Sequence, residues 1–206
     1  IKLANIYYPD WICRFYLGKT TDFNLVNKIK SFQNTEVFLM NEDENWSGMF
    51  WRFYAADDES VDIMLSRDCD SRIGKREKYA VEEWLDTDKS FHIMRDHPYH
   101  SVPILGGMWG CKKNILSGLT KKINITQQQN YWQVDQDFLR STVFPHIKNN
   151  CIIHDEFFEK KPFPIQSGIR NQHHFVGQAY DGDGSVLDNK SESYLDYIFK
   201  SEGIKI

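Results

Sequence analysis

VDIMLSRDCDSR, residues 61–72, joins a mostly apolar run to a charged one, and this change indicates where a strand ends. The apolar run at 61–66 predicts a strand. Helical and strand patterns alternate around it, which favours an α/β fold with a mainly parallel central sheet. Ligands bind beyond the carboxyl ends of the strands in such sheets, and Asp68 and Asp70 follow this strand at once.

Further elements are expected on both sides of this segment. Helices are predicted at 22–32, 75–86, 112–119, 133–140 and 191–200. Strands are predicted at 3–8, 35–40, 90–95, 103–109, 150–154 and 173–180, and residues 49–56 fit either a strand or a helix. The length of the chain corresponds to a single domain.

Composition narrows the classes of partner. The 206 residues have a net charge of −4 and no basic stripe, so we expect no nucleic acid partner. No run of about 18 apolar residues is present, so we expect no transmembrane segment. The four cysteines are far apart and form no CxxC pair, which indicates reduced thiols in the cytoplasm. The chain begins with Ile1 rather than Met, and we expect further domains in the full-length protein.

The D-x-D pair predicts a metal and diphosphate site. Two carboxylates two residues apart repel each other unless a cation lies between them. A hard divalent cation meets this need and also neutralises a bound diphosphate. Arg67 and Arg72 flank the pair and could contact phosphate. The alternatives are a turn of solvated aspartates and a phosphatase-type D-x-D-x-T/V motif, which Arg72 at the fifth position disfavours.

Several motifs in a fixed order resemble those of a known family. They are Trp51-Arg52, SRDCDSR, KREKYAVEEWL, FHIMRDHPYH, ILGGMWG, Asp135-Gln136-Asp137 and His154-Asp155. Over roughly residues 7–178 they resemble GT-A glycosyltransferase domains of bacterial polysaccharide loci and of large DNA viruses, including chlorella viruses. The resemblance implies a Rossmann-like GT-A fold, with a nucleotide-binding part at about 1–110 and an acceptor-binding part at about 111–206. If the chain is viral, its location would be the host cytoplasm.

The resemblance also implies a ligand set. Mn²⁺ or Mg²⁺ would be held by Asp68, Asp70 and His154, with His173 and His174 as rivals for the histidine position. A histidine that follows a strand is also often structural. We expect a UDP-sugar donor by analogy with other D-x-D transferases, and a glycan acceptor.

Donor contacts are expected from several segments. Arg52 could reach the donor near Asp68, or form a salt bridge with a core aspartate such as Asp62. Trp109 could stack on a ligand or pack in the core. The loop at residues 7–14 could contact the nucleotide, or it could be an ordinary turn with Trp11 packed inside. The full set of expected donor-binding residues is Tyr8, Asp10, Arg14, Arg52, Asp68, Arg72, Gly107 and Trp109.

Asp135, Gln136 and Asp137 are the predicted catalytic residues. They begin a predicted helix, where acidic residues also serve as caps. A similar D-Q-D occurs in retaining GT-A enzymes, so we expect a retaining hexosyl or deoxyhexosyl transferase. Asp135 or Gln136 would face the sugar, and Asp137 would cap the helix.

Two other functional classes remain as alternatives. The first is a nucleotidyltransferase that forms sugar nucleotides, although residues 7–18 lack its Gly-rich run. The second is a non-catalytic sugar-binding module. Residues 181–192 imitate part of a calcium loop, but Val186 stands where glycine is needed, so we interpret this segment as a turn.

Overall fold

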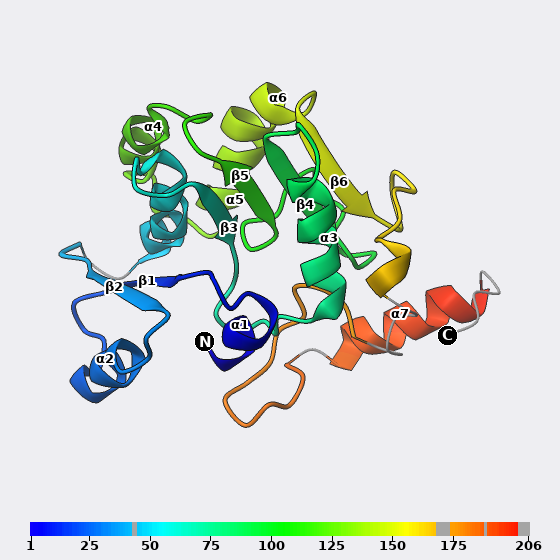
Figure 1. Ribbon diagram of the computed structural model, residues 1–206, viewed down its shortest axis with the longest axis horizontal. Helices are drawn as coiled ribbons and strands as arrows, with labels where there is room; N and C mark the ends of the chain where they lie inside the picture. The colour runs from blue at the N-terminus through cyan, green and yellow to red at the C-terminus, as the bar shows by residue number, and fades with distance from the viewer. Residues whose placement is uncertain (43–44, 168–173, 188, 202–206) are drawn as a thin grey trace.

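The computed structural model describes residues 1–42, 45–167, 174–187 and 189–201, and its centre is a four-stranded sheet (Figure 1). The strand order is β3-β5-β4-β6. Strand β5 is antiparallel to both β3 and β4, and β4 is parallel to β6. Three strands therefore run in one direction and β5 alone is reversed, which confirms the predicted α/β fold. The bounds are β3 Ile63–Ser66, β4 Phe91–Arg95, β5 Trp109–Lys112 and β6 Cys151–Asp155.

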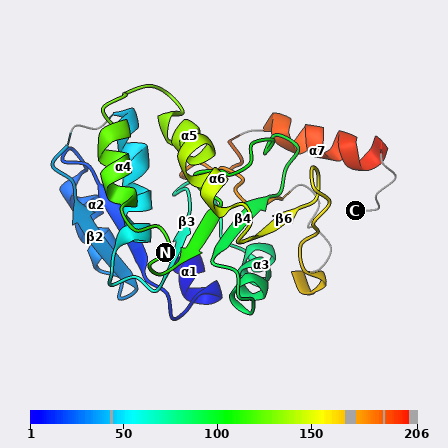
Figure 2. The ribbon, with the colours of Figure 1, turned by 90° about the horizontal axis from the view of Figure 1, so that it is seen from above.

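Helices cover both faces of this sheet (Figure 2). One face is covered by α3 (Lys75–Leu85), which buries Val81 and Trp84 against side chains of β3 and β6. The opposite face is covered by η1 Trp46–Asp57, α4 Leu119–Thr126, α5 Val134–Phe138, the π-helical turn η2 Leu139–Val143 and α6 Phe144–Ile147. Strand β3 serves both layers, because Ile63 and Leu65 face α3 while Met64 packs into the opposite core.

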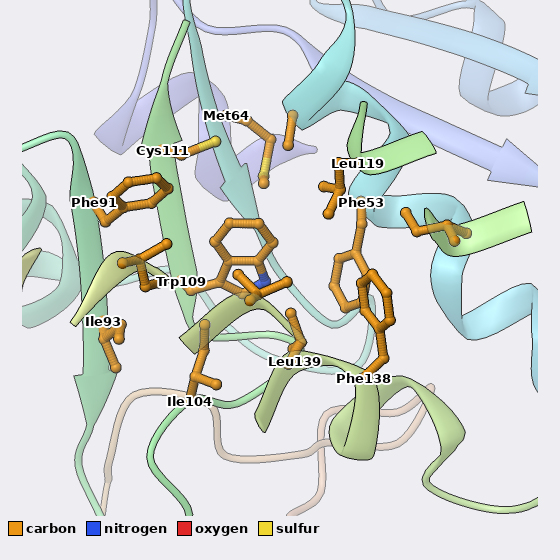
Figure 3. Packing of buried hydrophobic residues seen from close by; sticks show 14 of the residues in the cluster. Phe53, Met64, Phe91, Ile93, Ile104, Trp109, Cys111, Leu119, Phe138 and Leu139 are labelled. Carbon is orange, nitrogen blue, oxygen red and sulfur yellow. The ribbon is translucent and has the colours of Figure 1, made fainter. Parts of the chain in front are cut away.

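The larger core lies between the sheet and the second group of helices. Figure 3 shows the Trp109 indole surrounded by side chains that include Phe53, Ile104 and Leu139. Trp109 is fully buried, and its ring centre lies 5.6 Å from that of Phe53. This core fixes η1 and α5 against the end of β3, which is the part of the fold that positions the site.

The 3₁₀ conformation of η1 fits the spacing of its buried residues, which recur at every third position. Every third residue from Ser47 to Ala56 is buried, namely Ser47, Phe50, Phe53 and Ala56. Side chains three residues apart are eclipsed in a 3₁₀-helix, so these four form one row against the core. The neighbouring row contains Trp46, Met49 and Arg52, and it leads from the surface towards the sheet.

Smaller elements surround this framework. They are α1 Lys2–Tyr7, β1 Cys13–Leu17, α2 Phe23–Lys30, β2 Thr35–Leu39, η3 Ile165–Ser167 and α7 Asn189–Ser201. Strands β1 and β2 form a separate parallel pair. The Asp22 side chain caps α2 by accepting a hydrogen bond from the Leu25 amide. Within the described residues, we find no helix with the length and apolar character needed to cross a membrane. The four cysteines are free thiols.

Four predicted elements differ from the structure. Residues 3–8 form helix α1 rather than a strand, because Ala4 and Tyr8 are the buried positions and lie four residues apart. The strand expected at 103–109 begins only at Trp109, after a turn closed by the Met108 amide and the Leu105 carbonyl.

The other two differences lie further along the chain. Residues 112–118 contain no helix, since α4 starts at Leu119, where Asp57 accepts hydrogen bonds from the Gly118 and Thr120 amides. Of the strand expected at 173–180, residue 173 lies outside the described residues. The described part makes only isolated bridges after a turn at Gly177, which has a φ of 85°.

Candidate functional site

Asp68 lies just beyond the carboxyl end of β3 and is held from two sides. It forms an ion pair with Arg52 of η1. On the other side the chain passes very close at Gly107, where an added Cβ would collide with the Asp68 carboxylate. The Ser66 hydroxyl donates a 2.5 Å hydrogen bond to the Gly106 carbonyl, which fixes this loop against the strand. Glycine at position 107 therefore makes room for the Asp68 side chain.

Arg52 also binds the first residue of the D-Q-D motif. Its Nη2 atom lies 2.7 Å from Asp135 Oδ2, and the Asp135 side chain is only 2% exposed. The alternative partner proposed from the sequence, Asp62, instead pairs with Lys113 at 3.1 Å. Arg52 thus links two carboxylates from distant parts of the sequence. We call Arg52, Asp68 and Asp135 the arginine–carboxylate cluster.

The rest of the D-Q-D motif divides between two environments. The Gln136 amide borders the cluster, since a Cβ at Gly106 would lie 2.8 Å from Gln136 Nε2, and Gln136 Oε1 is buried without a hydrogen-bond partner. Asp137 turns to the surface, where it accepts hydrogen bonds from Tyr131 at 3.0 Å and Arg140 at 2.8 Å. Asp137 lies in the first turn of α5, where acidic residues are favourable, and its carboxylate binds these two side chains there.

Asp70 and Arg72 face a different segment of the chain. The Tyr180 amide donates a 2.8 Å hydrogen bond to the Asp70 carbonyl, and Ser71 forms a bridge with Ala179. The Arg72 guanidinium lies over the Tyr180 ring, 5.3 Å from its centre. Among the described residues, no carboxylate pairs with Arg72 and no cationic side chain pairs with Asp70. The side chains at 70 and 72 are both exposed and could meet a ligand.

The two flanking arginines of the motif therefore differ. Arg67 donates to Glu77 of α3 at 2.6 Å and to the Ser66 carbonyl at 2.7 Å, so it holds the strand end against the helix. Arg72 keeps its guanidinium at the surface. Of the two, only Arg72 has the freedom to bind an anion.

The two aspartates have the chemistry of a divalent cation site. Partial removal from water and the negative charge of Asp68 raise the pKa of the Asp70 carboxyl. Mg²⁺ is typically held by one or two carboxylates and by substrate phosphate oxygens, with water completing its shell. Asp68 and Asp70 match that limited protein contribution, and the residues present thus fit such an ion.

His154 lies elsewhere, on the α3 side of β6. Its Nδ1 atom is 2.8 Å from His92 Nε2, and its Nε2 atom is 3.5 Å from Glu83. Burial lowers the pKa of both imidazoles. The described part of the chain holds no group of three or more His, Cys, Asp or Glu side chains arranged for a metal ion. The structure thus does not bring His154 to Asp68 and Asp70.

The rival histidines have different positions. His173 lies outside the described residues. His174 Nδ1 is 2.8 Å from the Tyr180 hydroxyl and 3.1 Å from Gln178 Oε1. His174 therefore belongs to the segment that borders Asp70.

The predicted nucleotide residues near the N-terminus form a separate region. Tyr8 is buried beside Trp11, with ring centres 5.5 Å apart, and burial followed by the charge of Glu77 raises the pKa of its phenol. Tyr8 and Asp10 line a hollow of about 360 Å³ between α1 and α3. Arg14 is held by Glu36 at 2.9 Å and by Asp58 at 2.6 Å. No described ion pair or hydrogen bond links Tyr8, Asp10 or Arg14 to the arginine–carboxylate cluster.

The structure also tests the predictions for Trp109 and for the calcium-like segment. Trp109 is fully buried, so core packing is its role and the stacking surface expected there is wrong. In the calcium-like segment, Asp181 Oδ1 accepts hydrogen bonds from the amides of Asp183, Gly184 and Ser185. Glu192 accepts one from Gln178. Residues 181–187 thus form a turn, as predicted, whereas residue 188 lies outside the described residues and residues 189–192 belong to α7.

Several residues of the site were not found from the sequence. The expected donor-binding residues include Gly107 but not Gly106, although the glycines of ILGGMWG all allow close approach, and a Cβ at Gly106 would collide with the Arg52 guanidinium. The sequence predicts Tyr180 and Gln178 as part of a strand, and no local pattern links them to Asp70. The bridge between Ser71 and Ala179 and the hydrogen bond from the Tyr180 amide to the Asp70 carbonyl bring this segment beside the motif.

Comparisons with known proteins were made for the whole chain. The sequence matches no known protein family, and no curated protein shows significant similarity to it. Among solved structures, the chain is similar to a glycosyltransferase involved in the glycosylation of the major capsid of PBCV-1. The TM-score is 0.44 and the sequences are 19% identical, over 70% of this chain and 82% of the other.

Proposed function

We propose that this chain is a metal-dependent glycosyltransferase that moves a sugar from a nucleotide-diphosphate donor to a glycan acceptor. The observation that best supports this function is the convergence of Arg52, Asp68 and Asp135 beyond the carboxyl end of β3. Asp70 continues the same turn. This is the edge of an α/β sheet where ligands bind, and the carboxylates and guanidinium groups there suit a cation and an anionic leaving group.

In this proposal Asp68 and Asp70 hold Mn²⁺ or Mg²⁺. When bound, the ion would neutralise the diphosphate and stabilise the charge that the leaving group gains. Arg72, whose guanidinium is exposed and lies over the Tyr180 ring, would bind phosphate oxygens beside it. Arg52 would keep the Asp68 carboxylate in place, because its other contact fixes it to the buried Asp135.

Asp135 and Gln136 would act on the sugar itself. During transfer, the bond between the anomeric carbon and the phosphate oxygen breaks and its electron pair leaves with the diphosphate, while the acceptor hydroxyl oxygen bonds to the carbon and passes its proton to an oxygen of the departing diphosphate. The carbon passes through a state with positive charge, which a nearby carboxylate and amide oxygen stabilise. The buried, unpartnered Oε1 of Gln136 is suited to this role. We propose that the reaction retains the anomeric configuration and that the donor is a UDP-hexose or UDP-deoxyhexose.

The test compares two aspartates at the two ends of strand β3. Asp70→Asn keeps the size of the side chain and removes its charge, whereas Asp62→Asn is a matched control because Asp62 is 85% exposed and pairs only with Lys113. Release of nucleoside diphosphate is measured from UDP-, GDP- and CMP-sugars, with Mn²⁺ and after metal removal. We expect Asp70→Asn to lower the rate by roughly 100-fold or more and Asp62→Asn to leave it unchanged.

Other results would contradict the proposal in defined ways. Full transfer by the metal-stripped protein or by Asp70→Asn would exclude a role for the ion at this site. Preference for GDP- or CMP-sugars would overturn the UDP assignment alone. Thermal stabilisation only by a nucleoside triphosphate with a sugar phosphate would favour a nucleotidyltransferase. NMR of the product's anomeric configuration tests retention, and an inverted product would make Asp135 a candidate base.

A further inference from the structure

Two exposed tryptophans lie on one face of the molecule. Trp46 is 47% exposed and Trp132 is 65% exposed. They belong to segments far apart in the sequence, which meet where the Trp46 amide donates a 3.0 Å hydrogen bond to Asn130 Oδ1. Large exposed aromatic side chains gathered at one place commonly mark a binding surface. Neither tryptophan contributes to the cores described above.

The first of these segments leads directly to the arginine–carboxylate cluster. Trp46, Met49 and Arg52 occupy one row of the 3₁₀-helix η1, and Arg52 Nε donates to the Met49 carbonyl at 3.1 Å. With a rise of about 2.0 Å per residue, Trp46 lies about 12 Å along the helix axis from Arg52. Met49 between them is also exposed. These three side chains therefore form a line along the surface of η1 that ends at Arg52.

The second segment, which carries Trp132, leads to the arginine–carboxylate cluster through α5. The Tyr131 hydroxyl donates to Asp137, which lies two residues after the Asp135 that binds Arg52. Figure 2 shows η1 beside α4, with α5 on the same side of the sheet. Both segments thus run from an exposed tryptophan to the residues to which we assign the chemistry.

We infer that Trp46 and Trp132 form the outer part of a binding surface for a saccharide chain, the acceptor of the proposed transfer. Aromatic rings offer an apolar face to the C–H side of a pyranose while neighbouring polar groups bind its hydroxyls. The surface has this mixture, because Asn130 accepts from the Trp46 amide, and Asp137, which is paired with Arg140, accepts from the Tyr131 hydroxyl. The inference rests on the proposed function for the identity of the chain as acceptor, but saccharide binding itself does not.

Binding is tested without donor or metal, so that it can be separated from catalysis. The probes are tetrasaccharides of glucose, mannose, galactose, xylose and N-acetylglucosamine, each titrated to about 10 mM, which detects a Kd of about 1 mM. The readout is the NMR shift of the tryptophan indole N–H signals. Trp132→Ala and Trp46→Ala are compared with Phe23→Ala, because Phe23 on α2 is also a highly exposed aromatic residue, at 73%. The same titration is repeated with Asp70→Asn.

We expect at least one tetrasaccharide to shift the Trp46 and Trp132 signals in the natural sequence and in Asp70→Asn. Each tryptophan variant should bind at least about five-fold more weakly, and Phe23→Ala should bind normally. Absence of any shift, or equal weakening in Phe23→Ala, would overturn the inference. Concentration-dependent self-association that Trp132→Ala abolishes would overturn it in favour of a protein interface. If a saccharide binds as expected but no nucleotide sugar is cleaved, the proposed transfer fails while the binding surface stands.

Discussion

Replacing Arg52 with methionine tests the central feature of the site, the pairing of one guanidinium with two carboxylates. The Asp135 side chain is 2% exposed and Arg52 is 18% exposed, so water screens this pair weakly. Removing one partner of a buried ion pair costs about 3–5 kcal/mol, because the remaining charge is left unpaired. The ion pair between Arg52 and Asp68 adds close to zero to this cost, because the Asp68 side chain is 43% exposed and water screens the pair.

We therefore expect Arg52→Met to lower the free energy of unfolding by about 3 kcal/mol, the low end of that range, since Arg52 is not wholly buried. For a chain of this size the melting temperature should fall by roughly 6–12 °C. Urea denaturation measures the free energy change. The matched control is Arg140→Met, which breaks the exposed pair with Asp137 and should change stability by less than about 0.5 kcal/mol.

A double-mutant cycle decides whether the loss arises from the unpaired carboxylate. Asp135→Asn removes the charge that Arg52→Met leaves behind. The combined variant should therefore be more stable than the sum of the single effects predicts, by at least about 1 kcal/mol. Additivity within about 0.5 kcal/mol would refute the reasoning, as would an Arg52→Met variant with the stability of the natural sequence.

Two further predictions concern the glycine loop and the acid stability of the fold. Gly107→Ala should lower stability by about 1–3 kcal/mol and depress transfer, because its Cβ collides with the Asp68 carboxylate, whereas Gly182→Ala has open space and should behave normally in the same melts and assays. Hydrogen bonds from Ser60, followed by one from Arg14, lower the pKa of the Asp58 carboxyl to about 2. Because its ordinary pKa is about 3.9, Asp58 stabilises the fold above pH 4 and loses this effect as the pH falls towards 2. The difference in melting temperature between the natural sequence and Asp58→Asn should accordingly shrink over that range, and a constant difference would contradict the assignment.

The elements that could be predicted from the sequence are those with a clear apolar period. Helices α2 and α3 and strands β3, β4 and β6 lie where the sequence predicts them, because the helices bury one regular face and the strands are short apolar runs bounded by polar residues. The prediction for residues 3–8 is wrong because a short, mostly apolar segment fits a strand as well as a helix turn. The burial of Tyr8 against α3 distinguishes the two, and that contact is not visible in the sequence.

The site shows the same division between local and long-range information. The position of Asp68 and Asp70 could be predicted, since a polar pair directly after a strand must lie at the sheet edge. The pairing of Arg52 with Asp135 could not, because 83 residues separate them. An arginine among aromatic residues predicts a buried partner, but the choice between Asp62 and Asp135 depends on how η1 and α5 pack. His154 failed as a ligand for a related reason: the pleat of β6 places its ring on the α3 side.

Charge balance connects the arginine–carboxylate cluster to the cation that we propose. Arg52 is shared between Asp68 and Asp135, so one positive charge serves two carboxylates, and Asp70 adds a third without a cationic partner among the described residues. The cluster with Asp70 therefore retains two negative charges, which one divalent ion would balance. Arg72 stays outside this balance, since its guanidinium lies over Tyr180, and it remains available to the diphosphate. The same shared guanidinium explains why a monovalent ion would be a poor substitute: it would leave a carboxylate uncompensated beside the incoming phosphates, where like charges repel.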